Sequence, residues 1–182
     1  MEGLLIVIFI IIVTICAISI FYVITYNRFQ DYIIRINEVE SMIDNNLRNK
    51  YDLLNRAIPI IKSSVPKEKE IFGEIVKLRS RKLGNFELYR ILIRASNEFG
   101  ALKEEFDNID KSSELKKIST QIKDIDLNLD NQIDYYNENI SIYNNLLKKF
   151  PSNVVAIFCK YKEKLFFDRK DMNDDDYNDF KL

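Results

Sequence analysis

The side chains with the most suggestive spacing for chemistry are four oxygen ligands at every second position, Asp124, Asp126, Asn128 and Asp130. Such an alternation opens the calcium-binding loop of EF-hands. That loop also requires a glycine at its sixth position and a glutamate at its twelfth, where this chain has Leu129 and Tyr135. The four residues also belong to the polar face of a strongly periodic helical pattern. We therefore expect solvated side chains here and no metal site.

The residues that other kinds of catalytic site usually need are missing from this sequence. The sequence contains no histidine, the commonest general base and metal ligand. Cys159 therefore has no histidine to activate its thiol, and two cysteines cannot form a disulfide framework or a zinc site. The four glycines are isolated from one another, so no glycine-rich phosphate loop exists. We expect no enzyme, no cofactor and no small-molecule substrate.

Composition points to a helical protein of one domain outside its apolar N-terminal stretch. Lys and Arg number 27 against 28 Asp and Glu, so the net charge of −1 gives no general surface for nucleic acid. Four Gly and three Pro in 182 residues are far fewer than average, which is typical of long helices with few turns.

The residues at 3–26 form an uncharged stretch of mostly Ile, Leu, Val and Phe. As a helix it reaches about 36 Å, enough for a hydrocarbon core of about 30 Å. No basic n-region or cleavage site accompanies it, so we expect a retained transmembrane anchor. Arg28 and Arg35 follow the stretch and no basic residue precedes it. Positive charge favours the cytoplasmic side, which predicts an external N-terminus and a cytoplasmic remainder.

The predicted bundle occupies 27–167, beginning with a helix that continues directly from the anchor. Its apolar residues recur in steps of three and four from Phe29 to Val65, with a kink or loosened turn at Pro59. A second helix is expected over 66–83. Gly84 should close it in the left-handed conformation, and Asn85 should cap the third helix, at 86–106.

The fourth helix, 115–150, has the cleanest apolar repeat and follows a connection at 107–113. Phe150 should pack on its apolar seam, Pro151 should end it, and Ser152 should cap a short fifth helix through Phe158. An aromatic patch follows at 161–167. The acidic residues 168–182 should form a disordered tail.

The fold class is therefore all-α, a transmembrane helix continuing into an antiparallel, up-and-down bundle. The second and third helices either form a hairpin, which gives four helices, or lie end to end as one broken rod. Periodicity leaves both arrangements open.

Several short motifs resemble those of the LemA family. They are Tyr26-Asn27 after the span, Asn49-Lys50-Tyr51-Asp52-Leu53-Leu54, Lys67–Glu70, Tyr135-Tyr136-Asn137, Tyr143-Asn144, Phe150-Pro151-Ser152-Asn153 and Tyr161-Lys162. The resemblance covers roughly 26–167, although Asn55-Arg56 replaces the family's usual Pro-Asn and 80–97 is short. It implies a bacterial-type inner-membrane protein with a cytoplasmic up-and-down four-helix bundle and no established enzymatic activity.

These motifs supply the candidate interaction residues, which are Tyr26, Asn27, Tyr136, Asn137, Tyr143, Asn144, Phe150, Pro151, Ser152, Asn153, Tyr161, Phe166 and Phe167. A structural role explains the Phe-Pro-Ser-Asn corner. A docking role, together with Tyr161, Phe166 and Phe167, is compatible with it. The expected partners are the lipid bilayer and either unknown proteins or further copies of this chain. We expect a scaffold, or alternatively a membrane-tethered signalling component that self-associates through coiled-coil seams.

Overall fold

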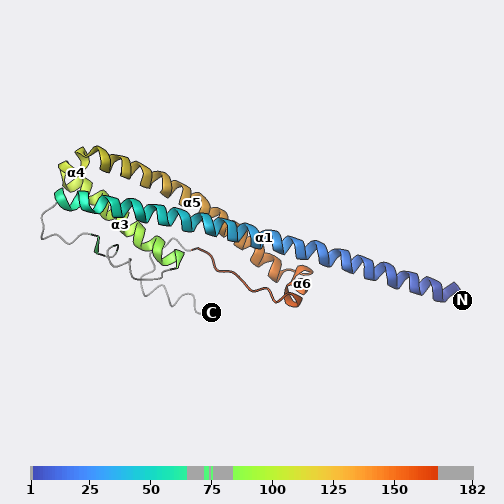
Figure 1. The fold of residues 1–182 in the computed structure, drawn as a ribbon. Coiled ribbons are helices and arrows are strands. Elements are labelled where there is room, and N and C mark those ends of the chain that lie inside the picture. The colour runs from blue at the N-terminus through green and yellow to red at the C-terminus, as the bar shows by residue number, and fades with distance from the viewer. Residues whose placement is uncertain (1, 65–71, 74, 76–83, 168–182) are drawn as a thin grey trace. The chain divides into compact units, whose positions relative to one another are not determined.

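The computed structural model describes residues 2–64, 72–73, 75 and 84–167 (Figure 1). These residues contain helices and no strand. The helices are α1 (Glu2–Ser64), α3 (Asn85–Glu105), α4 (Asp107–Lys111), α5 (Ser113–Lys148) and α6 (Ser152–Phe158). The all-α, bundle-like fold class is therefore confirmed. Most of the expected second helix and all of the acidic tail lie outside the described residues, as does the choice between four helices and a broken rod.

Two compact units divide the chain, and α1 and α5 contribute to both. Unit 1 comprises Met1–Val39 and Tyr135–Phe166, and unit 2 comprises Glu40–Asp134 and Phe167–Leu182. In unit 2, Asn46 bonds Gln132 and Lys50 bonds Asp126. From the first pair to the second, the residue number rises in α1 and falls in α5. The two helices are therefore antiparallel in unit 2. Unit 1 includes the apolar N-terminal stretch, and unit 2 includes α3 and α4.

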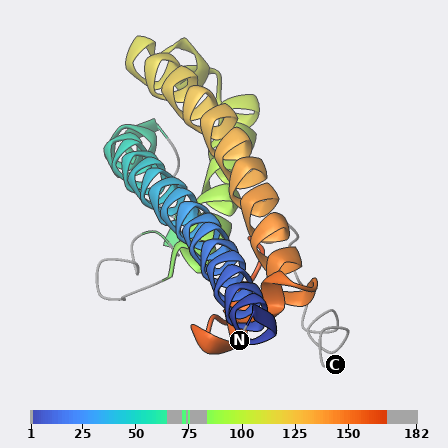
Figure 2. The same ribbon diagram turned by 90° about the vertical axis from the view of Figure 1, so that its right-hand side faces the viewer.

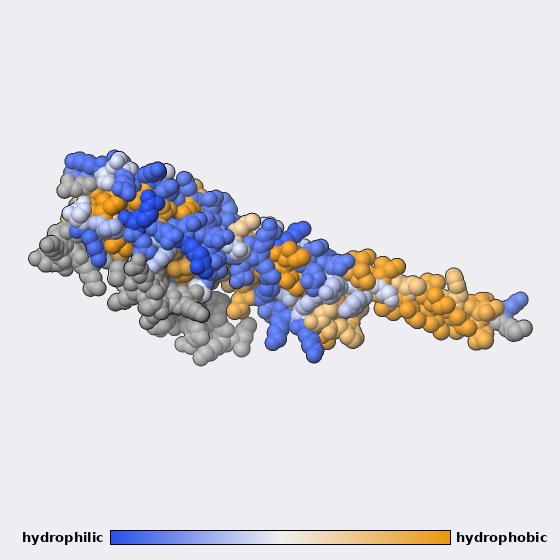
Figure 3. All heavy atoms as spheres, viewed as in Figure 1, coloured by the Kyte–Doolittle hydropathy of each residue, from blue (hydrophilic) through white to orange (hydrophobic). Residues whose placement is uncertain are grey.

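Helix α1 is a single element of 63 residues, about 95 Å at the helical rise. The side chains from Gly3 to Ile24 are exposed, and they form the continuous hydrophobic surface at one end of Figure 3. The predicted stripe is buried from Phe29 onward, at Phe29, Ile36, Val39, Ile43, Leu47, Leu54, Ile58 and Ile61. The apolar stretch and the bundle therefore share one helix, as predicted. Pro59 lies inside α1 without ending it.

Helix α3 begins one residue earlier than expected. Gly84 is its N-cap, with φ −71° and ψ 159°, and its carbonyl accepts from the amide of Leu88 at 3.0 Å. The predictions that Gly84 is left-handed and that Asn85 is the cap are therefore wrong, because Gly84 takes the extended conformation that an N-cap requires. The buried face of α3 is formed by Tyr89, Leu92, Ala95, Phe99 and Leu102.

The connection predicted at 107–113 contains the short helix α4, whose Ile109 is fully buried. Burying this one side chain holds the connection against the bundle. The following helix, α5, repeats the predicted seam, which is buried at Leu115, Ile118, Ile122, Leu129, Ile133, Ile140 and Tyr143. It ends at Lys148, two residues before the predicted boundary.

The corner after α5 differs from the prediction in two ways. Phe150 is 82% exposed, so the prediction that it packs on the seam is wrong. Ser152 does not cap α6, because Pro151 occupies the N-cap position. The hydroxyl of Ser152 donates backward to the carbonyls of Leu146 and Lys149, at 2.7 and 2.8 Å. It therefore satisfies the Leu146 carbonyl near the end of α5, whereas the Lys149 carbonyl also accepts from the Asn153 amide at 2.9 Å. The Phe150-Pro151 peptide bond is cis.

Candidate functional site

An aromatic cluster joins α1 to the end of α5 in unit 1. The ring of Phe29 meets Tyr143 edge-on, with centroids 5.8 Å apart, and Tyr161 at a tilt, with centroids 4.9 Å apart. Gln30 donates to the Tyr161 hydroxyl at 2.7 Å. We call Phe29, Tyr143 and Tyr161 the aromatic junction. It lies one turn beyond the end of the apolar stretch, where the sequence of α1 is no longer uniformly apolar.

Burial makes the two tyrosines of the aromatic junction weaker acids than an exposed tyrosine. Removal from solvent raises the pKa of Tyr161 to about 12, and burial also raises the pKa of Tyr143. The hydroxyl of Tyr143 donates to the Lys162 carbonyl at 3.1 Å. Both phenols therefore stay protonated near neutral pH and serve as hydrogen-bonding groups, which suits them to structure better than to proton transfer.

The segment 161–166, here called the strap, runs back along α5 without helical structure. Asn144 is 5% exposed and bonds both backbone groups of Lys164. Its Nδ2 donates to the Lys164 carbonyl at 2.8 Å, and its Oδ1 accepts from the Lys164 amide at 3.0 Å. A paired amide contact of this kind imitates one step of a β-ladder. The Tyr143-Asn144 motif therefore fixes the strap to α5.

The remaining tyrosine–asparagine motifs are divided between core and surface. Tyr136 packs against the core of unit 1, and Asn137 beside it is half-buried. Tyr26 is 38% exposed and stacks on Tyr22, with centroids 6.4 Å apart, while Asn27 is exposed. In the Phe-Pro-Ser-Asn corner, the Oδ1 atom of Asn153 is buried without a hydrogen-bond partner among the described residues.

The candidate docking aromatics differ in their contacts and exposure. Tyr161 belongs to the aromatic junction, and Phe166 is 55% exposed. Phe167 is half-buried within unit 2, where its ring meets Phe86 and Tyr89 of α3 edge-on, at 5.6 and 5.3 Å. Of these three side chains, Phe166 is the most exposed, and Tyr161 and Phe167 are half-buried.

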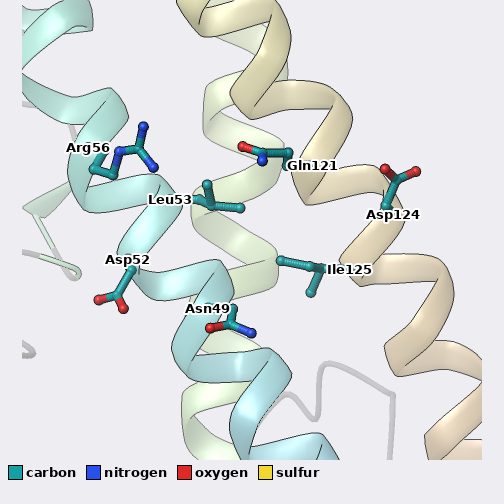
Figure 4. Close-up of a pocket in the computed structure, with 7 residues that line it drawn as sticks. All are labelled: Asn49, Asp52, Leu53, Arg56, Gln121, Asp124 and Ile125. Atoms are coloured by element: carbon teal, nitrogen blue, oxygen red, sulfur yellow. The ribbon is translucent and has the colours of Figure 1, made fainter.

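Unit 2 contains an open groove between α1 and α5, with a volume of about 400 Å³ (Figure 4). Leu53 and Ile125 point toward each other across the helices and form its apolar floor. Its polar edges carry Asn49, Asp52, Arg56, Gln121 and Asp124. Carboxylates, amides and a guanidinium around a small apolar floor can bind a polar chain segment.

Next to the groove lies a buried charge that sequence reasoning missed. The side chain of Lys50 is 1% exposed, and its Nζ lies 2.6 Å from Oδ1 of Asp126, which is 40% exposed. Asp126 is one of the four residues that resemble a calcium loop, and it is a lysine partner here. The available signal was the position of Lys50, which falls between apolar seam residues. Within the described ranges, no three Cys, Asp or Glu side chains are grouped so that they could hold a metal ion.

Comparison with known proteins gives one family. No curated protein and no solved structure matches the chain. The model of the LemA family matches residues 39–178, which begins beyond the apolar stretch and includes the groove, the Tyr143-Asn144 motif and the Phe-Pro-Ser-Asn corner. This match covers most of the sequence and agrees with the motifs quoted above. The chain belongs to the LemA family.

Proposed function

We propose that this chain is a single-pass membrane protein whose helical bundle serves as a non-enzymatic scaffold for other proteins. The continuity of α1 carries the proposal. Of the described helices, α1 is the one long and apolar enough to cross a membrane, and it enters the bundle core without a break. A flexible tether would let the bundle diffuse away from the bilayer. A shared helix instead holds the start of the bundle directly at the membrane surface.

The N-terminus lies outside the cytoplasmic membrane and the bundle lies in the cytoplasm in this proposal. Arg28 and Arg35 support it, since basic residues next to a span favour the cytoplasmic side. Protease treatment of sealed spheroplasts tests the orientation. The C-terminal part should resist digestion until the membrane is broken. Digestion in intact spheroplasts would contradict the orientation.

The groove in unit 2 is the proposed partner-binding surface, because it combines an apolar floor with unlike charges at its edges. Self-association through the apolar seams is less well supported. The seam residues Leu47, Leu54 and Ile122 are each at most 4% exposed within one chain, so they are not available to a second copy.

Affinity purification from native membranes with crosslinking tests this role. The wild type should retain defined partners that Arg56→Glu loses. The matched control, Lys117→Glu, makes the same charge reversal at an exposed position of α5 outside the groove. Equal partner recovery by the wild type, Arg56→Glu and Lys117→Glu would contradict the proposal that partners bind in the groove. A ladder containing only copies of this chain would favour the self-associating alternative.

A further inference from the structure

Helix α6 is apolar on two faces, and the bundle covers one of them. Val155 and Ala156 are 2% and 4% exposed and belong to the core of unit 1. Val154, Ile157 and Phe158 follow the i, i+3, i+4 spacing of a second stripe and are 42%, 75% and 76% exposed. Phe150, just before α6, is 82% exposed. A soluble corner would carry polar residues at these positions.

The position of α6 along α1 identifies what borders this stripe. The Cys159 Sγ atom, directly after α6, lies 3.5 Å from the hydroxyl of Tyr22. Thr25, one turn further along the same face of α1, is 7% exposed, whereas its neighbours in the apolar stretch are exposed. Both ribbon views place α6 beside this part of α1 (Figure 1 and Figure 2). The end of α6 therefore lies beside the last turn of the apolar stretch.

That turn lies in the membrane interface. The stretch 3–26 is about 36 Å long, and a hydrocarbon core is about 30 Å thick. The excess of about one turn places Tyr22–Tyr26 near the headgroups at the bundle side. The exposed stripe of α6 is thus held at the depth where aromatic and aliphatic side chains partition into bilayers.

The lysines around α6 favour a membrane that contains anionic lipid. Residues 148–164 contain five Lys and one Glu, in a chain whose net charge is −1. Lys148 pairs with Glu163 at 2.7 Å, and Lys149, Lys160 and Lys162 are exposed. Apolar side chains flanked by lysines are typical of segments that lie in the interface of anionic membranes.

We propose that α6 is a second membrane contact, which inserts Val154, Ile157 and Phe158, with Phe150, into the headgroup region of an anionic bilayer beside the span. This contact rests on the proposed membrane anchoring. It would fix the rotation of α1 about its axis, because a span alone leaves a helix free to rotate. The stripe would then reach about 5–10 Å into the boundary between headgroups and acyl chains.

The absence of tryptophan allows single reporters to be placed in the full chain. Phe158→Trp reports on the stripe, Phe9→Trp on the span, and Tyr135→Trp on an exposed position of α5 in the same unit, 44% exposed. Each variant is reconstituted into vesicles of phosphatidylcholine with and without phosphatidylglycerol. Tryptophan quenching is then measured with spin-labelled lipids of two depths and with aqueous iodide.

The proposal predicts that the indole of the Phe158→Trp variant is quenched most by lipids labelled near the headgroup, and more strongly in phosphatidylglycerol vesicles. Replacing Lys149, Lys160 and Lys162 with Gln in that variant should remove the preference for phosphatidylglycerol.

Three outcomes would contradict the proposal in distinguishable ways. If iodide quenches the Phe158→Trp variant as strongly as the Tyr135→Trp variant while deep labels still quench the Phe9→Trp variant, the contact is overturned and the anchor is kept. Protection of the Phe158→Trp indole from both lipid labels and iodide would show a protein cover and would also overturn the contact. Failure of deep labels to quench the Phe9→Trp variant would overturn anchoring and contact together.

Discussion

Asn144 in α5 and Lys164 in the strap bond each other through both ends of the asparagine side chain, at 2.8 and 3.0 Å. One buried carboxamide therefore satisfies an amide and a carbonyl that lie twenty positions further along the chain. Because the strap forms no helix, its backbone groups depend on such external partners. This relationship explains why an asparagine follows a tyrosine at this place in the sequence.

Replacing Asn144 with Leu should release the strap. The substitution keeps the approximate size of the side chain and removes both bonds, which costs about 1–3 kcal/mol where the freed groups stay buried. Amide exchange at Lys164 should become faster, and trypsin should cleave more readily after Lys160 and Lys162. Asn145→Leu is the matched control, since Asn145 is exposed on the next position of α5. Equal cleavage of the two variants would show that the strap is held by other contacts.

The sequence predicted the long helices well because their burial follows a regular period. The steps of three and four after Phe29 and Leu115 recur in the buried residues of α1 and α5, and no loop chemistry interrupts them. Pattern strength also explains why Asp124 and Asp130 could be assigned to a helix in spite of their resemblance to a calcium loop.

The wrong predictions concern residues that can serve either the helix before them or the helix after them. A serine after a helix can cap the next helix or bond the previous one, and Ser152 does the latter. A glycine can end a helix or begin one, and Gly84 begins α3. Phe150 has the right period for the seam, but α5 ends before it and the side chain turns outward. Local sequence contains each possibility, and the packing of neighbouring elements decides between them.

The groove and the buried lysine could not be predicted from spacing alone. Lys50 lies among seam residues, but its partner Asp126 is 76 positions away, and the pairing depends on the register of α1 against α5. That register is set by the summed packing of many apolar side chains.

The Lys50–Asp126 pair should behave as an ion pair with a buried lysine and a partly exposed aspartate. Asp126→Ala leaves the charge of Lys50 buried without this carboxylate, and the free energy of unfolding should fall by about 1–3 kcal/mol, less than for a fully buried pair because Asp126 is 40% exposed. Lys50→Met removes the charge itself and fits the same space, so its effect should be smaller. Chemical denaturation in detergent measures both.

The double variant distinguishes this explanation from simple loss of contacts. Combining Lys50→Met with Asp126→Ala should restore stability relative to Asp126→Ala alone, since no buried charge remains. If the double variant loses the sum of the stability lost by the two single variants, the buried charge does not cause the loss in Asp126→Ala.

Glycine-to-alanine substitutions in and before α3 should differ in their effect on stability. Gly100 lies inside α3 and is exposed, and a Cβ added there meets nothing within 4 Å. Gly100→Ala should therefore raise the free energy of unfolding by about 0.5–1 kcal/mol, because alanine has less backbone freedom to lose. Gly84→Ala should bring no such gain, since alanine is a poorer N-cap than glycine. Thermal denaturation of both variants checks the difference. A gain at both positions would show that cap geometry is unimportant here.

Tyr161 should make stability depend on pH above 10. Its pKa is about 12 in the folded chain because burial disfavours the phenolate, whereas an unfolded tyrosine titrates near about 10. The folded state therefore holds this proton more tightly, so the contribution is complete below about pH 10 and is lost as the pH rises toward 12. Absorbance titration of tyrosinate should show a late step that loses the amplitude of one tyrosine in Tyr161→Phe and keeps its full amplitude in Tyr135→Phe, since the pKa of Tyr143 is raised as well. If the late step keeps its full amplitude in Tyr161→Phe, the late-titrating phenols are other tyrosines and the aromatic junction is more open than its contacts with Phe29 and Gln30 imply.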